Sequence, residues 1–169
     1  ATGRVLWDLL PVDGRRILGG SKRVQLHHGE SVAQHTLPLD QPLEKFGRDE
    51  IYVRIALELD TSGAGRKNVH RVSEETVFLT SPRYVHLPRT RTKIGVKMRN
   101  ARHATLTFSS SVFQHRFSFD VPGVPYRASD NYFDLYPGET KMAHLELSRA
   151  MTVGRLKKLL VTRSLVDTY

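Results

Sequence analysis

Apolar and polar residues alternate along much of this chain, and this period of two constrains its fold more than any other feature. Within IYVRIALELD, the odd positions of 51–59 are all apolar, whereas Arg54 and Glu58 fall on the opposite face. Successive side chains of a β-strand point to opposite faces, so the pattern predicts a strand that is buried on one side. The same alternation predicts three more strands, at 93–98 (KIGVKM), 103–108 (HATLTF) and 112–121 (VFQHRFSFDV).

Further short apolar runs between turn residues extend this pattern to most of the chain. Strands are predicted at 4–10, 22–27, 31–37, 72–80, 141–147 and 158–165, and short helices only at 41–48 and 148–158. Many short strands separated by turns are typical of β-sandwiches and barrels. A (β/α)₈ barrel needs about 250 residues and alternating helices, which this chain of 169 residues does not provide. The predicted fold class is therefore all-β.

The stretch SPRYVHLPRTRT at 81–92 is the predicted boundary between two modules. Pro82 and Pro88 lack the backbone N–H that a strand ladder needs, and the basic residues around them suit an exposed connection. We therefore expect one small sandwich at 1–88 and a second at 91–169.

Charge and cysteine content limit the partners of the chain. Residues 91–169 hold 13 Lys and Arg against 6 Asp and Glu, a formal charge of +7, but the basic residues are dispersed. Dispersed charge is typical of a solvated surface, so nucleic acid is not expected as a partner. No apolar run has the roughly 18–20 residues that cross a bilayer, so no membrane partner is expected either. The absence of cysteine and of a visible signal peptide favours a cytoplasmic location.

Groups that could perform catalysis or hold a metal are interpreted as structural. Glycosidic hydrolysis uses two carboxyl groups, for which Asp130, Asp134 and Glu139 are candidates. Aspartates beside a turn commonly bind backbone N–H groups instead. The eight histidines form no ligand motif such as HExxH. We therefore predict no catalytic residue, no metal ligand and no cofactor in this chain.

Aromatic residues are the candidates for a contact with sugar, because the face of a pyranose ring packs on an aromatic ring. They are Trp7, Tyr126, Tyr132, Phe133 and Tyr136. Phe133 is assigned to the core. The three tyrosines are predicted to contact either sugar or a neighbouring domain.

The stretch YRASDNYFDLYPGE at 126–139 is interpreted as having a structural role in the fold and no catalytic role. Phe133 and Leu135 would point into the sandwich at the period of a strand. Before them, Asp130 and Asn131 would bind turn amides, and Asp134 is given the same role. After them, Pro137 and Gly138 would reverse the chain, and Glu139 would begin the strand at 141–147.

The same residues also resemble a known domain. SDNYFDLYPGE is similar to the pattern S-D-N-F/Y-F-D-L-L-P-G-E of the C-terminal immunoglobulin-like domain of β-mannosidase-type enzymes in glycoside hydrolase family 2, with Tyr136 replacing the second Leu. TLTFSSSVFQHRFSFDVPG and the terminal RSLVDTY also resemble that domain. RVLWDLLPVDGRRI resembles the sandwich that precedes it, and HLPRTRTKI resembles the connector. The resemblance covers nearly the whole chain and implies two tandem immunoglobulin-like β-sandwiches, the first lacking its opening strands.

This resemblance implies a role for the chain. Such enzymes hydrolyse terminal β-mannosides with retention, and a glutamate acid/base and a glutamate nucleophile lie on an upstream (β/α)₈ barrel. No glutamate of this chain matches either motif. The chain is therefore expected to be a non-catalytic region that supports the barrel of its own polypeptide and contributes to the rim of its substrate pocket. Related exo-β-glucosaminidases share the architecture, so the substrate stays open. The alternative is a stand-alone carbohydrate-binding or adhesive module.

Overall fold

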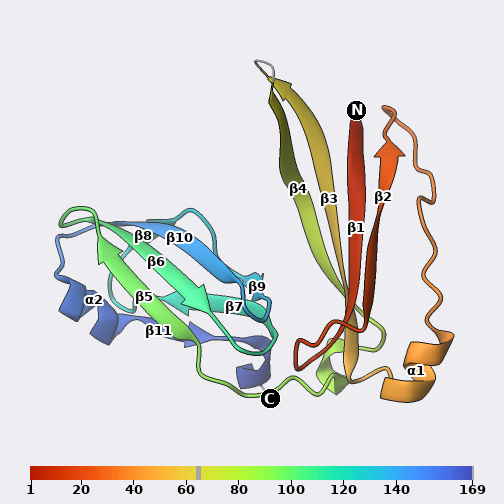
Figure 1. Cartoon of the computed structure of the whole chain (residues 1–169). Coiled ribbons are helices and arrows are strands. Elements are labelled where there is room, and N and C mark those ends of the chain that lie inside the picture. The colour runs from red at the N-terminus through yellow and green to blue at the C-terminus, as the bar shows by residue number, and fades with distance from the viewer. Residues whose placement is uncertain (64–65, 169) are drawn as a thin grey trace. The chain divides into compact units, whose positions relative to one another are not determined.

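The computed structural model describes residues 1–63 and 66–168, which fold into two compact units, Ala1–His86 and Leu87–Tyr169. Both units are built mainly from antiparallel strands (Figure 1), as the alternation predicted. No helix among the described residues has the length and apolar character needed to cross a membrane.

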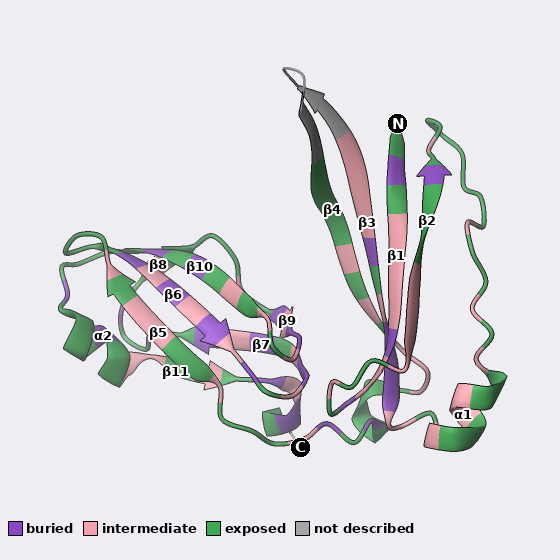
Figure 2. Cartoon of the chain, in the orientation of Figure 1, coloured by how far each residue is buried: buried purple, intermediate pink, exposed green. Residues whose placement is uncertain are grey.

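The first unit is one four-stranded sheet in the order β2-β1-β3-β4. Its elements are β1 (Thr2–Pro11), β2 (Leu18–Gln25), α1 (Asp40–Phe46), β3 (Ile51–Gly63), β4 (Arg66–Phe78) and a 3₁₀ turn, Pro82–Tyr84. A buried core lies at one end of this sheet (Figure 2), and Leu9, Ile51 and Val53 form it. Side chains from α1 and from the segment before it pack there, among them Leu39, Leu43 and Phe46.

This unit differs from the expected sandwich, because its described residues contain no second sheet. The strand predicted at 31–37 is a loop instead. Apolar and polar residues alternate in this segment, but the apolar residue Val32 is 65% exposed and does not contribute to a buried face. The carbonyl of Gln34 accepts a hydrogen bond from Lys22 Nζ at 2.6 Å. This backbone group is therefore bonded to a side chain. The predicted helix at 41–48 is confirmed as α1, which begins one residue earlier and ends two residues earlier.

The second unit is a sandwich of two sheets, in the orders β5-β6-β10-β8 and β11-β7-β9. Its strands are β5 (Lys93–Met98), β6 (His103–Ser109), β7 (Gln114–Asp120), β8 (Tyr126–Ala128), β9 (Phe133–Leu135), β10 (Thr140–Leu147) and β11 (Val161–Arg163). Helix α2 (Val153–Leu159) and a 3₁₀ turn (Leu165–Thr168) complete it. The predicted helix at 148–158 begins later than expected, and the strand predicted at 158–165 is shorter.

The core of the second unit is filled by the inward side chains of both sheets. Ala104, Leu106 and Phe108 of β6 are buried, and the residues between them are only partly buried. The ring of Phe108 contacts Phe117 and Phe119 of the facing sheet, with centroids 5.1 and 5.2 Å apart. The first pair is tilted and the second is stacked, and aromatic pairs of both kinds stabilise beyond the area that they bury. The two sheets are thus joined through one aromatic cluster.

Candidate functional site

The segment 126–139 supplies strands β8 and β9 and a turn, and its polar residues bind backbone groups. The side-chain amide of Asn131 substitutes for a neighbouring strand: its Nδ2 donates to the Phe119 carbonyl at 2.9 Å, and its Oδ1 accepts from the Phe119 N–H at 3.1 Å. The same Oδ1 accepts from the Tyr132 N–H at 3.0 Å. Asp130 Oδ1 accepts from the Asn131 N–H at 2.8 Å. Both residues therefore take the turn-binding role that the sequence suggested.

Asp134 stabilises an irregularity in the neighbouring strand β7. The register between β7 and β9 shifts between Gln114 and Phe117, and Arg116 there has a positive φ of 49°. Asp134 Oδ1 accepts from the Arg116 N–H at 2.8 Å and lies 2.9 Å from Nδ1 of His115. A bulge leaves backbone groups without a ladder partner, and the carboxylate of Asp134 meets this need.

The turn after β9 has the geometry that its Pro-Gly pair predicts. The Glu139 N–H donates to the Tyr136 carbonyl at 3.1 Å, and Gly138 has a φ of 77°. Proline at the second position and a positive φ at the third are typical of a type II turn, and the third position strongly favours glycine. The turn delivers the chain directly into β10, and Glu139 lies just before that strand.

Of the apolar and aromatic residues in this segment, three belong to the core. Phe133 and Leu135 are buried as predicted. Tyr136, predicted to contact sugar or a neighbouring domain, is only 3% exposed and packs on Phe113 at 5.6 Å between ring centroids. The prediction for Tyr136 is therefore corrected. Strand β9 ends at Leu135, so the alternation of inward and outward side chains stops one residue before Tyr136.

The other two tyrosines line one pocket of the second unit, called here the tyrosine pocket. It has a volume of about 460 Å³, and its lining residues are Ser118, Phe119, Asp120, Pro122, Tyr126, Tyr132, Val161 and Arg163. Ligand sites commonly have volumes of roughly 300–1,000 Å³. From the sequence, Tyr126 and Tyr132 were each predicted to contact sugar or a neighbouring domain. The fold brings both residues to the same pocket.

The two tyrosines of the tyrosine pocket differ: Tyr126 is held by a hydrogen bond, whereas the ring of Tyr132 is exposed. The Tyr126 hydroxyl donates to the Phe119 carbonyl at 3.1 Å. Burial, followed by the negative charge of Asp120, raises the pKa of Tyr126 above its ordinary value, so the phenol stays protonated. Tyr132 is 72% exposed and has a φ of 62°. That conformation is uncommon for a bulky residue, and such residues concentrate at functional sites.

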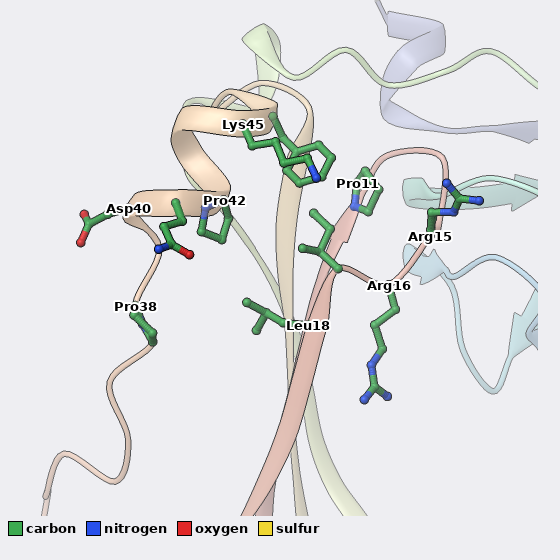
Figure 3. A pocket seen from close by; sticks show the side chains of 11 residues that line it. Pro11, Arg15, Arg16, Leu18, Pro38, Asp40, Pro42 and Lys45 are labelled. Atoms are coloured by element: carbon green, nitrogen blue, oxygen red, sulfur yellow. The ribbon is translucent and has the colours of Figure 1, made fainter.

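The first unit has a larger pocket, of about 980 Å³, between α1 and the β1–β2 hairpin (Figure 3). Its apolar residues include Ile17, Leu18 and Phe46, which also pack against the core of this unit. Its lining contains three basic residues but only one acid, Asp40. It therefore lacks the pair of carboxyl groups that glycosidic hydrolysis needs. Asp130, Asp134 and Glu139 line neither this pocket nor the tyrosine pocket.

Trp7, the remaining aromatic candidate for sugar contact, is half-buried within its own unit. Its ring stacks on His35 at 4.0 Å between centroids. On β2, a Cβ added to Gly20 would approach the indole to 2.7 Å, so the strand passes close to the ring. The stacked face of Trp7 is thus occupied by His35, and the ring is a poor platform for sugar.

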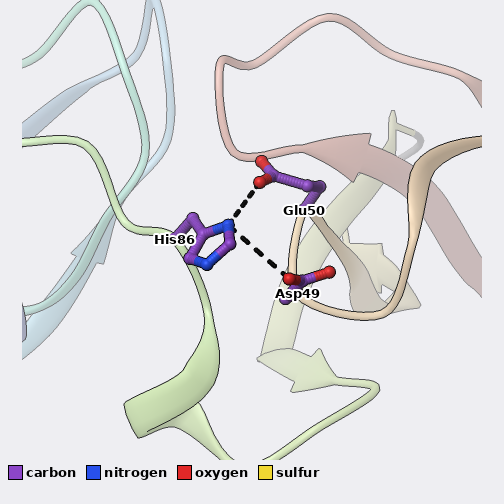
Figure 4. Close-up of side chains that lie close together, drawn as sticks. All are labelled: Asp49, Glu50 and His86. Carbon is purple, nitrogen blue, oxygen red and sulfur yellow. Dashed lines mark hydrogen bonds and ion pairs between the residues drawn. The ribbon is translucent and has the colours of Figure 1, made fainter.

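Asp49, Glu50 and His86 form a cluster that sequence reasoning missed (Figure 4). His86 Nδ1 lies 2.5 Å from Glu50 Oε1 and 3.6 Å from Asp49 Oδ2. The hydrogen bond to Glu50, and next its charge, raises the pKa of His86 above its ordinary value. The three ligand atoms lie within 4.8 Å of one another, close enough to hold a metal ion. Since 36 residues separate Glu50 from His86, no local motif pointed to the cluster.

The second unit matches a known family. Residues 89–168 match the family model Ig_mannosidase, described as an Ig-fold domain. With the two-sheet architecture, this match defines the unit as an immunoglobulin-like domain. The match to this family model confirms the resemblance drawn from SDNYFDLYPGE.

Solved structures provide a further comparison over 97% of the chain. The β-D-mannosidase from Dictyoglomus thermophilum is similar with a TM-score of 0.64 and 13% identity, and the match spans 18% of that enzyme's chain. The exo-chitosanase CsxA from Amycolatopsis orientalis has 14% identity and a TM-score of only 0.44, over 23% of its chain. The first likeness concerns the fold alone, and the second supports no inference. No curated protein sequence matches.

Proposed function

We propose that this chain is the non-catalytic C-terminal β-sandwich region of a β-mannosidase-like glycoside hydrolase. The observation that carries the proposal is the match of residues 89–168 to the mannosidase Ig-fold family. The shared fold with a β-D-mannosidase, of which this chain spans less than a fifth, supports it. In the proposed enzyme, which hydrolyses terminal β-mannosides with retention, the catalytic barrel belongs to the same polypeptide.

The described residues support a structural role for this region. Each of the two pockets above is lined by one carboxylate, Asp40 or Asp120. A retaining glycosidase needs two carboxyl groups about 5 Å apart, one as nucleophile and one as acid and base. We infer that this region supports the barrel and contributes to the rim of its substrate pocket, while the chemistry takes place on the barrel.

Two measurements test this function. The purified chain is incubated with a nitrophenyl β-mannoside, and we expect no release of nitrophenol above a buffer control. The coding sequence upstream of Ala1 is then read, and we expect an open reading frame long enough for a barrel of about 250 residues. Turnover that persists through stringent purification would contradict the non-catalytic assignment. A stop codon shortly upstream would contradict the larger enzyme.

The tyrosine pocket favours a second function, direct binding of carbohydrate by this region. Exposed Tyr132 beside Asp120 and Arg163 offers both an aromatic face and polar groups. This function is compatible with the first, because a supporting region can also hold part of a substrate.

A further inference from the structure

We propose that the tyrosine pocket is a subsite for one pyranose residue of a neutral oligosaccharide. Every group that forms it comes from the second unit. The choice of a mannoside as the probe rests on the proposed function. The chemistry of the pocket itself requires only a pyranose ring with hydroxyl groups at its edge.

Strand alternation places the polar groups of the pocket side by side. Phe117 and Phe119 of β7 point into the core, so Ser118 and Asp120 face outward. Strand β11 pairs with β7 in a register that sets Arg163 opposite Ser118. The same register sets Val161 opposite Asp120. A carboxylate, a guanidinium and a hydroxyl therefore converge on one outward face.

Tyr132 supplies the aromatic platform beside these groups. Its backbone N–H is held by Asn131 Oδ1 at 3.0 Å, and the same oxygen is fixed to Phe119 of β7. The backbone that carries the exposed ring is thus attached, through Asn131, to the strand that carries Ser118 and Asp120. A platform that is positioned before the ligand arrives loses less entropy on binding.

The polar groups match the edge of a sugar ring. The carboxylate of Asp120 accepts hydrogen bonds from hydroxyl groups, and the guanidinium of Arg163 donates to their oxygens. Oδ1 of Asp120 already accepts a hydrogen bond from the Val121 N–H at 2.8 Å. This bond fixes the orientation of the side chain. One acid and one base sum to no net charge, so the pocket favours a neutral ligand over an anionic or cationic one.

The first experiment measures binding to the intact chain. Mannobiose and mannotriose are titrated by isothermal calorimetry, and amide chemical shifts are followed by NMR. We expect saturable binding with the largest shifts at Tyr132 and at 118–120 and 161–163. Absence of saturable binding to both mannose and glucose oligosaccharides would overturn the subsite and leave the supporting role intact. Binding of a glucose oligosaccharide alone would support the subsite and contradict the choice of mannoside.

Variants then test the location of the site. Tyr132→Ala is expected to weaken binding about tenfold, the size of a lost aromatic contact. The matched control is Tyr84→Ala, because Tyr84 is a 56% exposed tyrosine of the first unit. Equal affinities for the two variants and the parent chain would overturn the location.

Two conservative changes keep the test valid if Tyr132→Ala disturbs the fold. Asp120→Asn preserves an oxygen for the Val121 N–H and removes the charge, and Arg163→Gln removes the guanidinium. Each is expected to weaken binding roughly tenfold with an unchanged thermal midpoint. Unchanged affinity in both variants would show that the polar groups do not bind the ligand and would overturn the proposal.

Discussion

The two units use the same alternating pattern of side chains but cover their sheets differently. In the second unit two sheets face each other, and Phe108, Leu106 and Leu145 are at most 2% exposed. In the first unit Val53 is buried, yet Val77 directly opposite it is 42% exposed. Alternation therefore specifies which side chains share a face, and a covering layer decides whether that face is buried.

Strands β3 and β4 of the first sheet are also linked by a network of charged side chains. Arg54 donates from both Nε and Nη2 to Glu74 Oε1, at 2.9 and 2.6 Å. Arg71 donates to the same oxygen at 2.8 Å and to Glu58 at 3.2 Å. The first unit thus depends partly on an ion-pair network, whereas the second depends on its apolar core.

The sharpest test of this comparison is a matched pair of truncations. Phe133→Ala removes a ring that contacts Phe108 and Phe117, and should lower the free energy of unfolding by about 3–5 kcal/mol. Ile55→Ala, at a residue 36% exposed in the first unit, should cost less than about 1 kcal/mol. Urea unfolding followed by NMR reports each unit separately. Similar losses in the two units would remove the contrast between them.

The ion-pair network provides the next largest effect. Glu74→Gln removes the charge that Arg54 Nη2 contacts at 2.6 Å, and the Arg54 side chain is only 13% exposed. We expect a loss of about 1–3 kcal/mol in the first unit. Trp7 is the only tryptophan, so its fluorescence during urea unfolding reports this unit. Glu75→Gln, at the adjacent exposed residue, is the control. If the two variants unfold at the same urea concentration, the network does not stabilise the sheet.

A smaller effect is expected at the turn before β10. Gly138 has a φ of 77°, and an added Cβ would meet no atom within 4 Å. Gly138→Ala should therefore cost only the backbone strain, about 1 kcal/mol, in the second unit. The control is Ala128→Gly, which exchanges the same two residue types at an exposed position of β8. A thermal midpoint equal to that of the parent chain would show that the turn tolerates a side chain.

The smallest effect is a pH dependence of the first unit. The hydrogen bond to Glu50 raises the pKa of His86 above its ordinary value of 6.5, and Asp49 adds to this. Because the folded pKa is higher, the contribution is complete below about pH 6.5 and is lost as pH rises through the folded value. The thermal midpoint from Trp7 fluorescence should fall slightly between about pH 5.5 and 8.5, and by less in His86→Gln. Identical slopes in the two proteins would contradict a role for His86.

Local features of the fold followed from the sequence with good accuracy. The alternation at 103–108 and 141–147 predicted buried Leu106 and Leu145, and Pro137–Gly138 predicted the turn. The strand expected at 31–37 is a loop because its apolar residues do not share one buried face: Val32 is exposed, whereas Leu37 packs against the core. Tyr136 was misjudged because β9 ends one residue before it.

What the sequence determined by itself was the identity of strands and turns, since φ preferences and side-chain alternation act between neighbouring residues. The tertiary structure decided which distant residues meet: Tyr132 with Arg163 at one pocket, and Glu50 with His86 in one cluster. It also decided that the first sheet stays partly open. The physical reason is that burial and contact depend on which segments pack together, and that is a property of the whole fold.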